Sequence, residues 1–221
     1  MQRSKIIVEL IRDEINVVQA MNILNLLLQD NNNEKIKRWL NSEINGYKAK
    51  EKLPQYRIIS SEIKGNVVAG YSIISNMNIP IKKEFNESVL KIKIRQSINE
   101  ILQYAKAEEE IEHHNLSMEI PLDYLNSIAL INGQVTHAHR ELSIYAFTNI
   151  INSLKPILLN ILLELEKVYG NLDNYYIDMK DKEKKEKVDK VIINIIDNSI
   201  NIGDQNKIEK TNIGDSNENR N

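Results

Sequence analysis

Apolar residues recur at helical spacing in three successive stretches near the start of the chain. Ser4 and Asn16 are placed to cap the first two stretches, and Asn33 is placed to cap the third. Gly46 stands where a residue of left-handed conformation commonly ends a helix. The pattern therefore predicts a three-helix N-terminal unit over residues 4–46.

β-branched and aromatic residues become frequent after Arg57, and they flank the group Lys64-Gly65-Asn66. A Gly-Asn pair suits the positive φ angles of a two-residue turn. We therefore expect a short β-hairpin over residues 58–74 that turns at Gly65-Asn66. Helical spacing returns at Glu87 and predicts a helix that continues to Ala105.

The second half of the chain predicts a short helix, an ambiguous segment and a long helix. Pro121 suits the first turn of a helix that runs to Ala129, whereas residues 134–141 fit a strand or a loop. An apolar stripe at spacings of three and four extends over residues 144–168. Pro156 should kink this helix or begin a second segment, because proline lacks the amide donor.

Residues 180–190, KDKEKKEKVDK, are almost entirely charged, which is typical of a solvated helical spacer or a flexible linker. The expected division of the chain is a globular domain (1–178), a charged linker (179–190) and a repeat tail (191–221). The predicted fold class is α+β and mainly α, with a three-helix unit, a short β-hairpin, long C-terminal helices and a short β-repeat tail.

The tail repeats the sequence Asn-Ile-Gly-Asp at residues 201–204 and 212–215. Its isoleucines predict short strands, which cannot bury an apolar face alone and should pair with other copies of the chain. The candidate oligomerisation residues are Ile193, Ile195, Ile200, Ile202, Ile208 and Ile213. A disordered polar tail is the alternative interpretation.

The amino-acid composition of the chain makes some classes of function less plausible than others. The chain has 29 basic and 31 acidic residues, a net charge of −2, which argues against nucleic acid or an anionic membrane as a partner. The absence of cysteine excludes disulfides and cysteine-ligated metal sites, and it suits a reducing cytoplasm. Acidic residues interrupt any signal-peptide core near the N-terminus, and Asn160 and Glu164 interrupt the most apolar later run. We expect a soluble, cytoplasmic protein without a membrane partner.

The richest cluster of polar and aromatic side chains lies in WLNSEINGYKAKEKLPQYR, residues 39–57. The residues that would form a site there are Glu43, Asn45, Tyr47, Tyr56 and Arg57. In one interpretation they converge in a cleft and bind an anion or a nucleotide. In the other, which we favour, the aromatic rings fill a junction between helix and hairpin while Arg57 pairs with Glu43 or with carbonyls at the helix end.

Two pairs of histidines are the other candidates for chemistry. His137 and His139 would face the same side of a strand, as metal sites often require, with Glu141 or Glu112 as a possible further ligand. The competing interpretation is that these residues, like His113 and His114, are surface histidines. No phosphate-binding loop, dinucleotide fingerprint or nucleophile elbow is present, and we expect no cofactor.

The run W-L-N-x-E-[I/L]-N-G-Y followed by L-P-x-Y-R resembles the signature of the AbiTii family of bacterial abortive-infection domains. Residues 4–15 resemble the opening helix of that family, and residues 158–167 resemble its late helix, so the resemblance covers most of residues 1–170. It implies a role in defence against phage. Other bacterial defence proteins end in short Ile–Gly–Asn repeats that are similar to this tail. The similarity implies an oligomer and favours a trimer.

Together these resemblances predict a non-enzymatic oligomeric sensor or effector whose partner is a phage or defence-system protein. Two alternatives stay open. One is a metal-dependent nuclease or nucleotide hydrolase that uses the histidines or the Arg57 region, and the other is a nucleic-acid-binding module.

Overall fold

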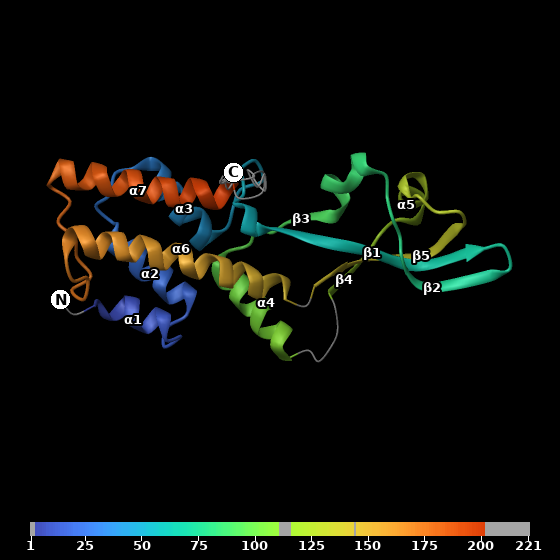
Figure 1. Ribbon diagram of the computed structural model, residues 1–221, viewed down its shortest axis with the longest axis horizontal. Coiled ribbons are helices and arrows are strands. Elements are labelled where there is room, and N and C mark those ends of the chain that lie inside the picture. The colour runs from blue at the N-terminus through green and yellow to red at the C-terminus, as the bar shows by residue number, and fades with distance from the viewer. Residues whose placement is uncertain (1–2, 111–115, 144, 202–221) are drawn as a thin grey trace, which may run out of the picture.

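The computed structural model describes residues 3–110, 116–143 and 145–201, which form two lobes joined by one long strand (Figure 1). Helices make up one lobe, and a small sheet with a short helix makes up the other. Strand β1 (Ile58–Ala69) begins beside the helical lobe and runs to the far tip of the β lobe. The molecule is therefore elongated.

The helical lobe is built around α6 (Ala146–Tyr169), whose apolar stripe contacts several other helices. The other helices of this lobe are α1 (Lys5–Ile11), α2 (Val17–Leu27), α3 (Glu34–Asn45), α4 (Ile98–Glu110) and α7 (Lys182–Asn201). Leu154, Leu158 and Leu162 of α6 are fully buried in the core that these helices share. Each such side chain contributes about 1.5–3 kcal/mol of burial free energy.

The β lobe contains β2 (Ser72–Asn78), β4 (Leu116–Glu119), β5 (Gln134–Leu142) and α5 (Leu122–Ile128). Its antiparallel sheet has the order β2-β1-β5-β4, and β3 (Lys91–Lys93) pairs with the start of β1. Single turns precede β1 and β3, namely η1 (Gln55–Arg57), η2 (Lys83–Phe85) and η3 (Asn86–Leu90). A second core gathers Ile63 and Val67 of β1 with Leu125 and Ile128 of α5.

The predicted three-helix unit and the α+β, mainly α class are confirmed. Asn16 and Gln19 form a capping box at α2, with side chain to backbone distances of 3.0 and 2.9 Å. Asn33 caps α3 through bonds from Lys35 N and Ile36 N. Local capping chemistry therefore sets the starts of these two helices.

Ser4 does not cap α1, contrary to expectation. Its hydroxyl and its backbone N–H instead donate to Glu166 Oε1 on α6, at 2.7 and 2.6 Å. The Arg3 guanidinium also donates to Glu166, and Leu172 N donates to Ser4 Oγ. The start of the first helix is thus tied to the end of the central helix.

The predicted hairpin turn at Gly65-Asn66 is wrong. β1 continues through these residues, and the chain reverses between Ala69 and Ser72, where Gly70 has φ +62°. A Cβ on Gly65 would lie 2.3 Å from the carbonyl oxygen of His137 on β5. Gly65 therefore permits close approach of two strands, beside a break in pairing register, instead of a turn.

The predicted helix from Glu87 to Ala105 is correct only in its second half. The chain forms a single turn, strand β3 and an extended segment before α4 begins at Ile98. Ser97 and Glu100 form a capping box there, because Glu100 Oε2 accepts from Ser97 N at 2.9 Å and Ser97 Oγ accepts from Glu100 N at 3.2 Å. Residues 134–141, left open between strand and loop, lie in β5.

Helix α6 continues through Pro156 without a second segment. It is also long and apolar enough to cross a membrane. In this structure its apolar stripe packs against α1, α2, α4 and α7.

The charged residues 182–190 are helical, which is one of their two expected forms, but the expected separate linker and the start of the expected β tail are wrong, because Lys182–Asn201 form one helix, α7. Val188, Ile192 and Ile196 recur every four residues and are buried against the helical core, where Ile193, Ile195 and Ile200 also pack. Asp189 accepts from the Asn31 amide at 2.7 Å. The remaining tail residues, including Ile202, Ile208 and Ile213, lie outside the described part of the chain.

Candidate functional site

The signature residues meet where α3 ends and β1 begins. Glu43 lies in the last turn of α3, Tyr47 follows Gly46, and Tyr56 and Arg57 belong to η1. Gly46 has φ +90°, and a Cβ there would lie 2.9 Å from the carbonyl oxygen of Arg95. Glycine is therefore required both by the backbone angle and by the close approach of the neighbouring chain.

The carboxylate of Glu43 is the centre of this cluster. Its Oε1 accepts from the hydroxyls of Tyr47 and Tyr56 at 2.5 and 2.6 Å. Arg57 Nε lies 3.1 Å from Glu43 Oε2, and Arg57 Nη2 donates to the same oxygen. The Arg57 guanidinium also stacks over the Tyr47 ring, 4.9 Å from its centroid. Both oxygens of Glu43 are therefore satisfied from within the protein.

Backbone of the segment before α4 completes the cluster. Arg57 Nη1 donates to the carbonyl oxygen of Gln96 at 2.6 Å, and Tyr47 N donates to that of Arg95 at 2.8 Å. Ile94 N donates to the Arg57 carbonyl at 2.8 Å. The sequence did not predict these contacts with residues 94–96. They are made by backbone groups, which every residue has, and they lie about forty positions away from Arg57 along the chain.

Burial governs the electrostatics of the cluster. The side chains of Glu43 and Arg57 expose no surface to solvent. Burial raises the pKa of Tyr47 and of Tyr56, and the Glu43 carboxylate raises both further. Burial, the largest single effect, would lower the pKa of Arg57, but the charge and hydrogen bonds of Glu43, together with Tyr47 and Tyr56, outweigh burial and raise it. Arg57 stays protonated and both tyrosines stay neutral over the physiological range.

Four of the five candidate ligand-binding residues are thus brought together, and Asn45 is not. Asn45 is exposed at the end of α3, where its amide donates to Asn41 Oδ1 at 2.8 Å. Of the four that meet, Tyr47 also lines a cavity of about 350 Å³ beside Trp39 and Ile196. Chemically the cluster is a closed ion pair that joins helix to strand, with both charges already paired.

His137 and His139 lie on one face of β5, as expected from strand geometry, and their ring centroids are 5.9 Å apart. Glu119 of β4 is the register partner of His139. Within the described residues, no group of three or more His, Cys, Asp or Glu side chains is arranged to hold a metal ion. His113 and His114, like Glu112, lie outside the described part of the chain.

Comparison with known proteins identifies the family. Neither the curated proteins nor the solved structures contain a match to this chain. The AbiTii family model, however, matches residues 4–193, from the first helix to the second half of α7. The match extends past the expected boundary at residue 178, in keeping with the packing of α7 into the helical core. This family suggests a role in abortive-infection defence. The chain belongs to the AbiTii family.

Proposed function

We propose that this protein is a non-enzymatic component of abortive-infection defence, and that it acts by binding a phage or defence-system protein through its β lobe. The defence role rests on the family. The mode of action rests mainly on one observation, the exposed and uncharged tip of the β lobe. The closed Glu43–Arg57 pair supports the same view, because it leaves neither charge available for a substrate.

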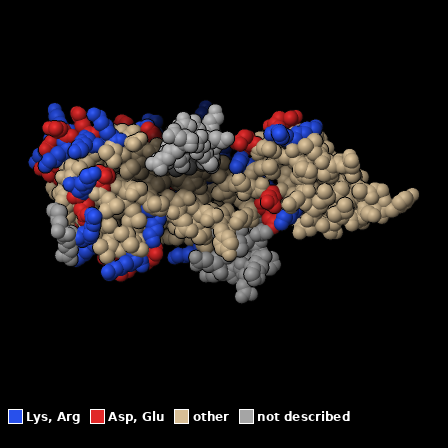
Figure 2. Space-filling view, viewed as in Figure 1, with Lys and Arg blue, Asp and Glu red and all other residues tan. Residues whose placement is uncertain are grey.

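The tip of the β lobe is apolar and exposed. The chain carries no Lys, Arg, Asp or Glu between Lys64 and Lys82. Within this stretch Tyr71 is fully exposed, and Ile73 and Ile74 are 70% and 46% exposed. Figure 2 shows the charged side chains gathered away from this tip. Ile73 and Ile74 are consecutive in β2 and lie on opposite faces of the strand, so both faces of the tip expose an apolar side chain. Exposed apolar side chains without neighbouring charges are typical of surfaces that bind proteins.

The same tip offers an open strand edge. β2 pairs with β1, and no other described strand pairs with it. Natural edge strands are commonly protected by charged residues or proline, and β2, SIISNMN, contains neither. An extended segment of a partner could add to this edge through backbone hydrogen bonds, while the isoleucines provide apolar contacts.

The oligomeric part of the proposal concerns the tail. The isoleucines up to Ile200 belong to helix α7, which leaves residues 202–221 for contacts between copies of the chain. A trimer is the favoured assembly. The support is the repeat of Asn-Ile-Gly-Asp at residues 201–204 and 212–215. Oligomerisation would present several β lobes to a partner and increase its avidity.

Phage plating on cells that express the Ile73→Lys variant tests the proposal. The substitution places a charge on the open edge without disturbing the core, so protection should be lost while the free energy of unfolding stays unchanged. Ile11→Lys is the matched control, because Ile11 is 57% exposed on the helical lobe. Wild-type protection by Ile73→Lys, or an equal loss in the control, would refute the role of the β lobe.

A further inference from the structure

A line of basic residues follows the strand that leads into α4. Residues 91–95 read Lys-Ile-Lys-Ile-Arg, so that basic and apolar side chains alternate. Ile92 and Ile94 pack toward the helical core. The alternation places Lys91, Lys93 and Arg95 on the opposite face, at intervals of about 7 Å. Three cations thus stand in a row along one extended segment.

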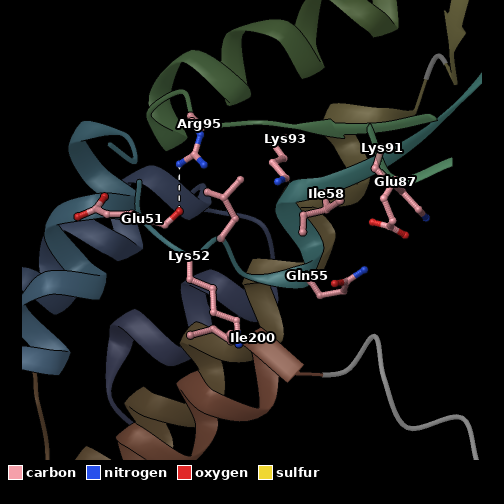
Figure 3. Close-up of a pocket in the computed structure, with 10 residues that line it drawn as sticks. Glu51, Lys52, Gln55, Ile58, Glu87, Lys91, Lys93, Arg95 and Ile200 are labelled. Atoms are coloured by element: carbon pink, nitrogen blue, oxygen red, sulfur yellow. Dashed lines mark hydrogen bonds between the residues drawn. The ribbon is translucent and has the colours of Figure 1, made fainter. Parts of the chain in front are cut away.

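These cations line a groove of about 450 Å³ (Figure 3). Its floor includes Ile58 of β1, the register partner of Lys93. Lys52 and Gln55 come from the spacer between α3 and β1, and Ile200 from the end of α7. The groove therefore lies at the junction between the two lobes.

Hydrogen bonds hold two of the three cations, Arg95 and Lys91, in place. Arg95 Nη1 donates to the carbonyl oxygens of Lys48 and Glu51, which joins the row to the opposite wall. Lys91 Nζ donates to Ser60 Oγ of β1 at 2.9 Å. Because these contacts position Lys91 and Arg95 before any ligand binds, the conformational entropy that these two side chains lose on binding is reduced.

The charge of the groove differs from that of the whole chain. Lys52, Lys91, Lys93 and Arg95 line it with only two acidic residues, Glu51 and Glu87. The Glu51 carboxylate is engaged in its own turn, where it accepts from Lys48 N at 2.7 Å and from Ser42 Oγ at 3.3 Å. The net charge of −2, which argued against nucleic acid, therefore does not describe this surface.

We infer that this groove binds the phosphate backbone of a single-stranded nucleic acid. A row of evenly spaced cations matches a ligand with evenly spaced negative charges, and phosphate contacts of this kind supply most of sequence-independent binding. The lining contains no aromatic side chain on which a base would stack. Recognition therefore depends on the backbone, whatever the base sequence. This inference is independent of the protein-binding role proposed for the β lobe.

Fluorescence anisotropy of the full-length protein with labelled oligo(dT) and oligo(U) tests the inference. Both probes should bind at about 50 mM salt, and affinity should fall as salt rises. The Lys91→Gln/Lys93→Gln variant should bind about tenfold more weakly, and its slope of log K against log salt should be smaller by about 1.4, as expected for two lost phosphate contacts. Arg95 is left unchanged because it also bonds to the backbone.

Lys182→Gln/Lys187→Gln is the matched control, since both lysines are exposed at the start of α7, away from the groove. Circular dichroism and thermal melting confirm that each variant is folded. The inference is overturned if the wild type binds neither probe, if the groove variant binds as the wild type does, or if the control loses as much affinity. It is also overturned if ATP competes as well as the oligonucleotide at equal phosphate concentration, because the ligand would then be a small phosphate compound.

Discussion

Arg57 and Glu43 form an ion pair that is completely shielded from solvent, at the point where the last helix of the N-terminal unit gives way to the long strand of the β lobe. Neither charge is stable there without the other, because an unpaired buried charge loses its hydration without compensation. The pair therefore makes the junction of the two lobes dependent on both residues.

Arg57→Ala should lower the free energy of unfolding by about 3–5 kcal/mol, since it leaves the Glu43 carboxylate buried without its cation. Urea denaturation measures the change. The double variant Glu43→Leu/Arg57→Met should lose less than the single variant, because neither charge remains. Glu164→Gln, which breaks a surface pair with Lys167, is the control and should change stability by about 0.5 kcal/mol or less. Equal losses in Arg57→Ala and the control would contradict this view of the junction.

Acid should destabilise the protein partly through Glu166. Burial alone would raise its pKa, but hydrogen bonds from Ser4 and the charge of Arg3 lower it below the ordinary glutamate value of 4.5. The unfolded state then binds the proton more readily, so the contribution of Glu166 is full above pH 4.5 and is lost as pH falls through the lowered pKa.

Glu166→Gln removes this titration, so its free energy of unfolding should fall less than that of the wild type between neutral pH and about pH 3. Urea unfolding at several pH values measures both slopes. If the free energy of unfolding falls equally in the wild type and the variant as the pH is lowered, Glu166 does not cause this pH dependence.

Gly65→Ala should destabilise the β lobe by about 1–3 kcal/mol, because the added methyl group meets the His137 carbonyl and the Ile79 side chain. Gly70→Asn is the matched substitution at the true turn, where nothing lies within 4 Å of the added Cβ and asparagine tolerates the positive φ. The Gly70→Asn substitution should change the free energy of unfolding by less than about 1 kcal/mol. Thermal melting of both variants shows which one loses more stability. A larger loss in Gly70→Asn than in Gly65→Ala would contradict the turn assigned between Ala69 and Ser72.

Truncation separates α7 from the tail. A chain that ends at Asn201 should melt as the full chain does, whereas one that ends at Asp181 should lose much of its stability with the burial of Val188, Ile192 and Ile196. Light scattering then tests the tail, because the chain ending at Asn201 should have a lower oligomeric mass than the full chain. An unchanged mass would refute oligomerisation through residues 202–221.

The sequence predicted elements that depend on local signals. The caps at Asn16 and Asn33 and the stop at Gly46 were read correctly because a side chain or a φ preference acts within a few residues. Gly65 was misread because the same residue type serves turns and close strand approach, and only β5, seventy residues away, decides between them.

Residues 87–97 were misread for a related reason. Leu90, Ile94 and Ile98 fit a helix, but Ile92 and Ile94 also fit a strand, and pairing with β1 decided in favour of the strand. In the candidate site, the sequence identified the Glu43–Arg57 pair as one of two interpretations. The structure shows that both side chains of the pair are buried, and Arg57 also bonds to the backbone of Gln96, which left no signal in the sequence.

Tyr47→Phe provides the most direct test of the claim that the AbiTii signature, residues 39–57, holds α3 and β1 together and does not itself bind a ligand. Tyr47 is the member of the Glu43 cluster that also lines a cavity, so it is the residue of the cluster that a ligand in that cavity would contact. The substitution keeps the ring under Arg57 and removes one hydrogen bond, at a cost of about 1 kcal/mol. Phage plating on cells that express this variant at the wild-type level should show full protection. Loss of protection by a variant that is folded and stable would contradict the account, because the signature would then have a direct role in function.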